Sequence, residues 1–214
     1  MTTNAQGVAH LWSAPNFLIL TTITPASGTA THASFNKNNT IFGVATSTSM
    51  VYYYNCTDYT LISSVNTGIG TGQIILDFSY DGNYILVCGG SSGNVKVITI
   101  STGAQFSSVS FSNSQKCVFA SNGNFLVSST NSATLKYFTM AGALVWDKNY
   151  NSCLDLNVDN ACATVVASCN NGANKNGYAY DPVGQTQMYS YTSTGILRVA
   201  QIAPDSSYIA YSGD

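Results

Sequence analysis

The stretch from Leu76 to Gly103 reads LDFSYDGNYILVCGGSSGNVKVITISTG, and the fold can be worked out from its pattern. Apolar residues alternate through Leu76, Phe78 and Tyr80, as in a half-buried β-strand. Asp81-Gly82-Asn83 is turn chemistry, because glycine reaches a positive φ without steric cost while Asp and Asn bond their own backbone. The stretch therefore opens with a strand and a tight turn.

The same stretch continues with more short strands. Tyr84 to Cys88 is apolar throughout, which predicts a strand that is buried on both faces. A second turn at Gly89 to Asn94 leads to a third strand at Val95 to Ile100, and Ser101-Thr102-Gly103 forms a third turn. With a fourth strand expected at Gln105 to Ser110, the stretch predicts one sheet of four antiparallel strands.

The chain repeats this pattern about every 42 residues. We align the copies on the apolar residue that precedes the first turn, which gives Phe35, Phe78, Phe119, Leu156 and Ile202. The separations between these residues are 43, 41, 37 and 46. A period of about 40–45 residues with four short strands is typical of a β-propeller. We therefore predict an all-β propeller of four-stranded antiparallel blades, with no helix longer than a turn or two.

The repeats divide residues 1–214 into one propeller domain with two incomplete ends. We expect blades at about residues 31–66, 74–110, 116–149 and 153–193, a half-blade at 1–24 and another at 196–213. The first half-blade resembles the third and fourth strands of a repeat, and the last resembles the first and second. We expect the two to complete one another as a fifth blade, within one chain or between chains. Pairing between chains would propagate into a filament unless its rotation closed.

The repeats also resemble those of a known family over almost the whole chain. Phe78-Ser79-Tyr80-Asp81-Gly82 resembles the F-S-P-D-G turn of WD repeats and of the related quinoprotein-type propeller repeats, and Ile202-Ala203-Pro204-Asp205 resembles it more faintly. The family's Trp-Asp pair at the end of the third strand is absent, because Trp146-Asp147 falls in a fourth strand. The Gly-His near the blade start and the structural Asp before the third strand are missing too. The resemblance implies a scaffold that binds other proteins.

The composition excludes several classes of function. Only 7% of the residues are charged, against about 25% in an average soluble domain, and there is no Glu. The net charge is -2 and the seven Lys and Arg are scattered, so a nucleic acid is an unsuitable partner. No apolar run reaches about 18 residues, so we expect no membrane-spanning helix.

The search for catalytic motifs finds none. The sequence has no Gly-x-Ser-x-Gly elbow, no H-E-x-x-H and no P-loop. His10 and His32 alternate with strand residues, so we interpret both as satisfied side chains of strands. Gly68 to Gly72 is rich in glycine but precedes no helix, so we interpret it as a flexible connector and not as a phosphate site. We expect no enzymatic activity, no cofactor and no metal.

Asp77 and Asp155 stand out because both directly precede a repeat residue, Phe78 and Leu156. Innermost propeller strands can place such carboxylates along the central channel, where a cation or a substrate group could bind. The alternative is that each carboxylate bonds the backbone of a neighbouring blade. Nothing near them in sequence supplies a partner base or nucleophile, so we expect neither to carry catalysis.

The cysteines and sequons bear on the compartment. The six Cys include no C-x-x-C, which argues against a zinc site. Cys153 and Cys169 fall on adjacent strands of the fourth blade, where they could be diagonal neighbours in a disulfide. Asn38 and Asn55 begin N-x-Thr sequons at expected turns. These features favour an extracellular or surface protein, while Met1 to Gly7 shows no signal peptide.

Two classes of function remain open at this stage. The first is a structural or protein-interaction module, which could bind its own kind. Its surface would be polar and uncharged, and Tyr52-Tyr53-Tyr54 is expected to place at least one ring outside, unless these rings pack between blades. The second is a carbohydrate-binding, lectin-like propeller, since aromatic and amide side chains are plentiful. Glycan cleavage is disfavoured because Glu is absent and no carboxylate pair is evident.

Overall fold

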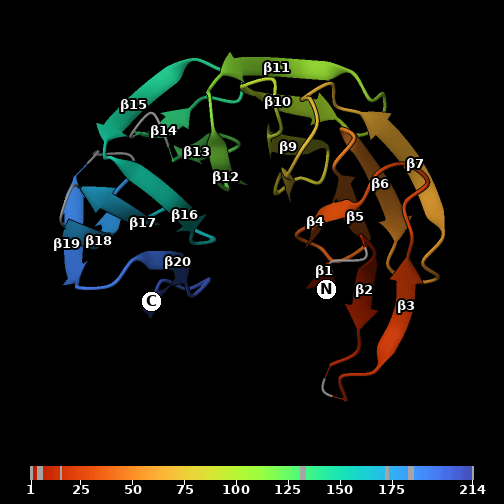
Figure 1. Cartoon of the computed structure of the whole chain (residues 1–214), viewed down its shortest axis with the longest axis horizontal. Helices are drawn as coiled ribbons and strands as arrows, with labels where there is room; N and C mark the ends of the chain where they lie inside the picture. Colours follow the sequence, from red (N-terminus) through yellow and green to blue (C-terminus); the bar gives the residue numbers. More distant parts are fainter. Residues whose placement is uncertain are drawn as a thin grey trace. The chain divides into compact units, whose positions relative to one another are not determined.

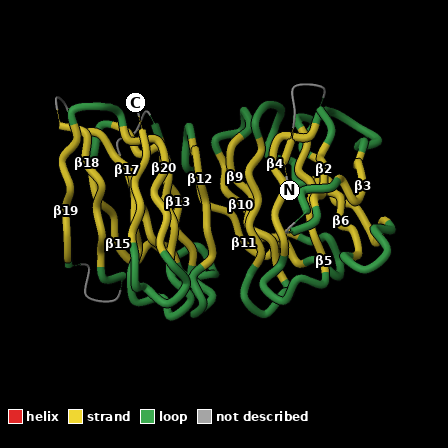
Figure 2. Tube along the Cα trace, turned by 90° about the horizontal axis from the view of Figure 1, so that it is seen from below, coloured by secondary structure: helices red, strands yellow, loops and turns green. Residues whose placement is uncertain are grey.

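The computed structural model describes residues 2–3, 7–14, 16–130, 134–171, 174–182 and 186–213, and all regular structure within them is β-strand (Figures 1 and 2). No helix in these ranges is long and apolar enough to cross a membrane. The strands form antiparallel sheets with the four-stranded blades that the repeat predicts. The chain divides into two compact units, Met1–Phe106 and Ser107–Asp214, which are described separately.

The first unit begins with a three-stranded sheet, followed by a four-stranded blade and most of a second. The three-stranded sheet comprises β1 (Thr2–Thr3), β2 (Ala9–Trp12) and β3 (Ile19–Ile23). The first blade comprises β4 (Ala30–Phe35), β5 (Ile41–Thr46), β6 (Met50–Asn55) and β7 (Leu61–Asn66). The second comprises β8 (Ile74–Phe78), β9 (Tyr84–Gly89), β10 (Asn94–Thr99) and β11 (Gln105–Ser110), and the division between the units falls within β11.

The second unit holds two complete blades and a two-stranded sheet. The third blade comprises β12 (Ser114–Phe119), β13 (Phe125–Ser129), β14 (Thr134–Phe138) and β15 (Leu144–Asn149). The fourth comprises β16 (Ser152–Val158), β17 (Val165–Asn171), β18 (Asn174–Tyr180) and β19 (Gln187–Ser193). The last sheet comprises β20 (Leu197–Ile202) and β21 (Ile209–Gly213).

The turn after each first strand is the local device that repeats. In the second blade the backbone N–H of Ser79 donates to the carbonyl of Tyr84 at 3.0 Å, and the N–H of Gly82 donates back to Ser79 at 3.0 Å. The Asp81 carboxylate accepts the N–H of Asn83 at 3.0 Å, which is the local bonding expected of Asp in a turn. Gly82 has a φ of 73°, a value that glycine adopts without a steric cost.

The fourth blade departs from the sequence alignment. The bond that Ser79 makes to Tyr84 is made there by Asp159 to Thr164, at 3.2 Å, so Val158 and not Leu156 ends the first strand. The alignment on Leu156 was wrong because Leu154-Asp155-Leu156 resembles Leu76-Asp77-Phe78 in sequence, whereas β16 continues to Val158 and is longer than β8. With Val158 in place, the separations become 43, 41, 39 and 44, which is a more even repeat.

The expectation that Tyr52-Tyr53-Tyr54 places at least one ring outside was wrong, because all three rings are buried. The middle strand β6 is paired on both sides and covered on both faces. Tyr52 and Tyr54 pack into the apolar cluster shared with β2, while Tyr53 packs on the opposite face against the cluster that contains Phe78. The alternative, that these rings pack between blades, is therefore the correct one. The connector between β7 and β8 is likewise packed, because Ile69 at its centre is fully buried.

Candidate functional site

The strand β21 differs from the second strand of every complete blade. β5, β9, β13 and β17 are each paired with a neighbour on both sides. Within the described ranges, β21 is paired only with β20. A strand with one unpaired side presents a row of backbone N–H and C=O groups to which another chain can add.

Exposure of the first residue of β21 agrees with this one-sided pairing. Ile209 lies opposite the last residue of β20, and the corresponding residues of the complete blades are Phe42, Ile85, Phe125 and Val165. Those four side chains are 0–1% exposed, whereas Ile209 is 37% exposed. The same position is thus core in four repeats and open in the last.

A hollow of about 500 Å³ lies beside Ile209, and we call it the tyrosine hollow. Its lining comes from β19, from β21 and from the turn that precedes β21. The lining residues are Tyr189, Tyr191, Ser206, Ser207, Tyr208, Ile209 and Tyr211. Among the described residues, the lining contains no charged side chain, so it suits an uncharged partner with apolar and hydroxyl groups.

Tyr211 is the most firmly held part of the lining. Its ring lies 2.5–2.7 Å from the place where a β-carbon on Gly177 would stand, so only glycine lets it approach the backbone of β18 so closely. The phenol donates to the carbonyl of Tyr178 at 2.9 Å, and the ring stacks on Tyr191 with centroids 6.5 Å apart and an interplanar angle of 10°. Burial raises the pKa of the Tyr211 phenol well above its usual value. The hollow therefore has a rigid floor.

The two serines of the hollow are already engaged. The Ser206 hydroxyl donates to the buried carboxylate of Asp159, which also accepts the N–H of Ala163 at 2.8 Å. Ser207 donates both its N–H and its hydroxyl to Asp205, at 3.0 and 2.5 Å. Polar contacts to a partner must consequently come mainly from the tyrosine hydroxyls and from the backbone of β21.

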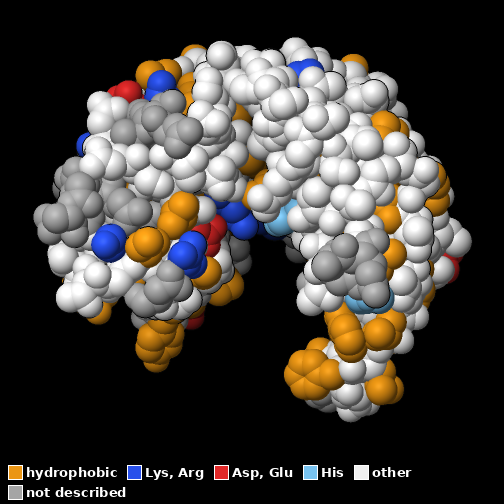
Figure 3. Space-filling model, viewed as in Figure 1, with side chains coloured by type: hydrophobic (Ala, Val, Ile, Leu, Met, Phe, Trp, Pro, Cys, Tyr) orange, Lys and Arg blue, Asp and Glu red, His pale blue; other side chains and the backbone are white. Residues whose placement is uncertain are grey.

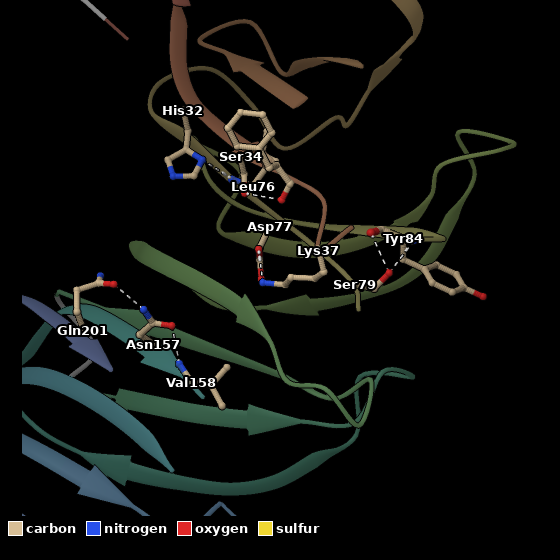
Figure 4. A network of polar contacts seen from close by, with 11 residues as sticks. His32, Ser34, Lys37, Leu76, Asp77, Ser79, Tyr84, Asn157, Val158 and Gln201 are labelled. Carbon is tan, nitrogen blue, oxygen red and sulfur yellow. Dashed lines mark hydrogen bonds and ion pairs between the residues drawn. The ribbon is translucent and has the colours of Figure 1, made fainter. Parts of the chain in front are cut away.

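Asp77 and Asp155 lie at positions that do not correspond, so the predicted match between them was wrong. Asp77 directly precedes the end of β8, while Asp155 lies three residues before the end of β16, where Asn157 takes the place of Asp77. The difference arises because β16 continues for two residues beyond Leu156. Asn157 donates to Gln201 at 2.7 Å (Figure 4).

Each of the two carboxylates forms an ion pair that the sequence reasoning missed. Lys37 approaches Asp77 to 3.5 Å, as Figure 4 shows, and its ammonium lies 4.9 Å from the centroid of the Tyr80 ring. Lys116 lies 3.8 Å from Asp155. Asp155 also accepts the backbone N–H of Ala200, in the neighbouring sheet, at 3.1 Å. This is the kind of contact that the alternative to a channel site predicts. Burial raises the pKa of Asp155, against the lowering effect of Lys116 and of its hydrogen bonds.

The two histidines hold strands together. His10 Nδ1 lies 3.0 Å from the Thr22 hydroxyl on the partner strand β3. His32 Nδ1 accepts the backbone N–H of Leu76 at 3.4 Å, which links β4 to β8 (Figure 4). The described residues contain no group of three His, Cys, Asp or Glu side chains placed to hold a metal ion.

Cys153 and Cys169 form a disulfide, and their positions are directly opposite and not diagonal. The bond joins β16 to β17, the two inner strands of the fourth blade. Cys88, Cys117 and Cys162 are buried free thiols. Of the two sequon asparagines, Asn38 lies in a turn, is exposed and accepts the Thr40 hydroxyl at 2.8 Å. Asn55 is the last residue of β6, just before a turn, is half-buried and accepts the N–H of Thr57 at 2.7 Å.

Comparison with known proteins shows the fold. No protein-family model matches the sequence, and no curated protein matches it. Among solved structures, the Cps50 (Swd1) beta-propeller domain of Myceliophteria thermophila has a TM-score of 0.74 at 12% identity, over 89% of this chain and 64% of that one. Hydrazine synthase of Kuenenia stuttgartiensis has a TM-score of 0.74 at 14% identity, over 88% of this chain and 58% of that one.

The fold of this chain is a β-propeller. The chain spans about three fifths of the length of each of these two solved structures. Their low identity gives no support to a choice between WD repeats and quinoprotein-type repeats.

Proposed function

We propose that this propeller is a non-catalytic scaffold that binds protein, and that it binds a β-strand of its partner at the edge of β21, over the tyrosine hollow. The observation that carries the proposal is the one-sided pairing of β21, where four equivalent strands are paired twice. The similarity to the Cps50 (Swd1) propeller supports it only at the level of the fold. Strand addition supplies affinity through the main chain and selectivity through side-chain pockets.

The pairing of β20 with β21 identifies the backbone donors of the free edge. The N–H of Ala203 donates to the carbonyl of Tyr208. Bonding alternates along an antiparallel pair, so the N–H groups of Ile209 and Tyr211 point away from β20. These two amides are the ones that a bound strand should protect from exchange with solvent.

Amide hydrogen exchange tests the proposal with three hairpin peptides taken from the chain itself, residues 8–23, 50–66 and 134–149. Each peptide carries the third and fourth strands of a blade or half-blade. We expect at least one to slow exchange at Ile209 and Tyr211, and proline at 209 to abolish its binding while Ile209→Ala weakens it. If no peptide slows exchange at either amide at saturation, strand addition is the wrong function.

A neutral saccharide is the second candidate ligand for the same hollow, because Tyr189, Tyr191 and Tyr208 expose aromatic faces and hydroxyls. Protein is favoured because the serine hydroxyls are engaged within the fold while the backbone edge is open. The two ligands separate on the exchange experiment and on a glycan array. A saccharide would bind the array and leave the amide of Ile209 unprotected.

The proposal gives Asp77 and Asp155 no catalytic role, so replacing both with Asn should leave strand binding unchanged. We also propose that the protein works outside the cell or on its surface. The disulfide and the exposed sequon at Asn38 support this compartment. A mass shift on enzymatic removal of N-linked glycan, lost in Asn38→Gln, would test it.

A further inference from the structure

We infer that the partner bound at the edge of β21 is the β2–β3 hairpin of a second copy of this chain, so that copies associate head to tail. This inference rests on the proposed function and names its partner. It would turn the scaffold into a self-assembling one. The argument comes from strand geometry, from side-chain exposure, from charge and from register.

The β2–β3 hairpin is built as the third and fourth strands of a blade. Its pairing has a bulge between Leu11 and Trp12. The first blade has its bulge at the same place, between Tyr53 and Tyr54, and the third blade has one between Tyr137 and Phe138. β20 and β21 are built as a first and second strand, with the repeating turn between them. The hairpin therefore has the structure of the third and fourth strands that follow such a strand pair in the complete blades.

One face of the hairpin is left open. Ala9, Leu11 and Ile23 pack into the apolar cluster shared with the first blade. On the other face, Trp12 is 38% exposed and Leu20 is 48% exposed. Figure 3 shows hydrophobic side chains gathered over the end of this hairpin. An exposed apolar patch of this kind marks an interaction surface.

The two surfaces match in charge. Residues 1–36 contain no Asp, Glu, Lys or Arg, and the part of the chain that the structure describes contributes no charged residue to the tyrosine hollow. Desolvation of an ionised side chain is the largest penalty in forming an interface, and contact between these two surfaces would not incur it. An acidic or basic partner would find no opposite charge on either surface.

The register follows from the complete blades. In the first blade Phe42 of β5 lies opposite Tyr54 of β6. Ile209 corresponds to Phe42, and Trp12 corresponds to Tyr54, since Trp12 pairs with Ile19 as Tyr54 pairs with Leu61. Trp12 of one copy should therefore lie opposite Ile209 of the other. Both side chains would lie over the tyrosine hollow.

The short strand β1 occupies part of the edge that the second copy needs. Thr2 pairs with His10 and Thr3 pairs with Ala9, on the side of β2 away from β3. The Trp12 indole also donates to the Thr2 hydroxyl at 3.0 Å. β1 must leave before β2 can pair with β21, so deleting residues 1–6 should strengthen association.

Sedimentation of the whole chain over a range of concentrations tests the inference with two variants, each broken on one surface. Trp12→Asp with Leu20→Asp places charge on the binding surface of the hairpin, and Tyr189→Asp with Tyr191→Asp places charge on the lining of the hollow. All four side chains are exposed, so both variants should fold, which circular dichroism checks. Ile62→Asp and Leu144→Asp are matched controls, because these exposed side chains lie within the first two residues of the outer strands of complete blades.

We expect the wild type and both controls to form larger species as concentration rises, with a shift to at least tenfold lower concentration when residues 1–6 are deleted. Each broken variant alone should stay monomeric, and an equimolar mixture should form dimers through the one intact pair of surfaces. A wild type that is monomeric throughout, or variants that assemble like the wild type, would overturn the inference. If peptides 50–66 or 134–149 then still protect the β21 amides, strand addition stands and only the second copy is wrong.

Discussion

The outer strands β15 and β19 belong to neighbouring blades of one unit, yet one is covered and the other is open. Trp146 and Tyr189 hold the same position, the third residue of the strand, just after a bulge. Trp146 is 4% exposed and donates from its indole nitrogen to the carbonyl of Pro182, which comes after β18 in the next blade. Tyr189 is 53% exposed. Among the described residues, a complete blade follows β15 and a two-stranded sheet follows β19, which leaves the face of β19 uncovered.

The largest expected effect is the difference in stability loss between truncating Trp146 and truncating Tyr189. Trp146 packs against Tyr137 and Tyr180, with ring centroids 5.5 and 6.2 Å apart. Trp146→Ala should therefore cost about 3–5 kcal/mol in the free energy of unfolding, the usual range for a large buried aromatic residue. Tyr189→Ala should change it by no more than about 0.5 kcal/mol. Urea unfolding measures both, and equal losses would show that β19 is not an open face.

The disulfide tests whether β19 is exposed because its blade is loosely formed. Cys153 and Cys169 are 16 residues apart in sequence and directly opposite in the sheet. Replacing both with Ser should lower stability by about 3 kcal/mol, the value expected for closing a loop of this length. The comparison is with Cys88→Ser, a buried thiol without a disulfide. If the double variant is as stable as wild type, the fourth blade is held by packing alone.

The close approach of the Tyr211 ring to Gly177 can be tested by substitution at both positions. A methyl group there would collide with the Tyr211 ring, so Gly177→Ala should destabilise the protein by about 1–3 kcal/mol, as overpacking does. The loss should shrink in a Tyr211→Ala background, because the colliding ring is gone. A double-mutant cycle on the unfolding free energy measures this coupling. Additive losses would mean that Tyr211 does not rest on Gly177.

The smallest expected effect is a pH dependence from Asp155. Its pKa in the folded protein is raised by burial, so the folded state binds the proton more tightly than the unfolded chain does. The contribution of this group to stability is thus present below about pH 4, the usual Asp value, and is lost as the pH rises through the raised pKa. The stability of wild type relative to Asp155→Asn should fall as the pH rises above about 4. A constant difference would mean that the Lys116 ion pair cancels the burial.

The fold could be predicted from the sequence because its signals are local. Turn residues such as Asp81 and Gly82 bond within a few residues of themselves, and their recurrence sets the period. The pattern failed in the fourth blade, where Leu154-Asp155-Leu156 resembles Leu76-Asp77-Phe78 although β16 continues to Val158. That local resemblance misplaced Leu156 as the repeat residue and Asp155 as the equivalent of Asp77.

The candidate site could not be predicted in the same way. Tyr52-Tyr53-Tyr54 drew attention as a cluster, but these rings lie on a middle strand with both faces covered. Tyr189, Tyr191 and Tyr211 are no more conspicuous in sequence, and they form the hollow because strands of two separate sheets, β19 and β21, lie close together. The signal that did point to the region was the incomplete last repeat, which lacks a third and fourth strand.

Amide exchange along β21 is the most direct measurement of the central claim that this edge is open and receives a strand. In dilute protein we predict that the Ile209 and Tyr211 amides exchange rapidly, while the Ala167 amide on the doubly paired strand β17 is protected. On raising the concentration or adding a hairpin peptide, the two β21 amides should become protected. Protection of Ile209 and Tyr211 equal to that of Ala167 at the lowest concentration, without any added peptide, would contradict the account.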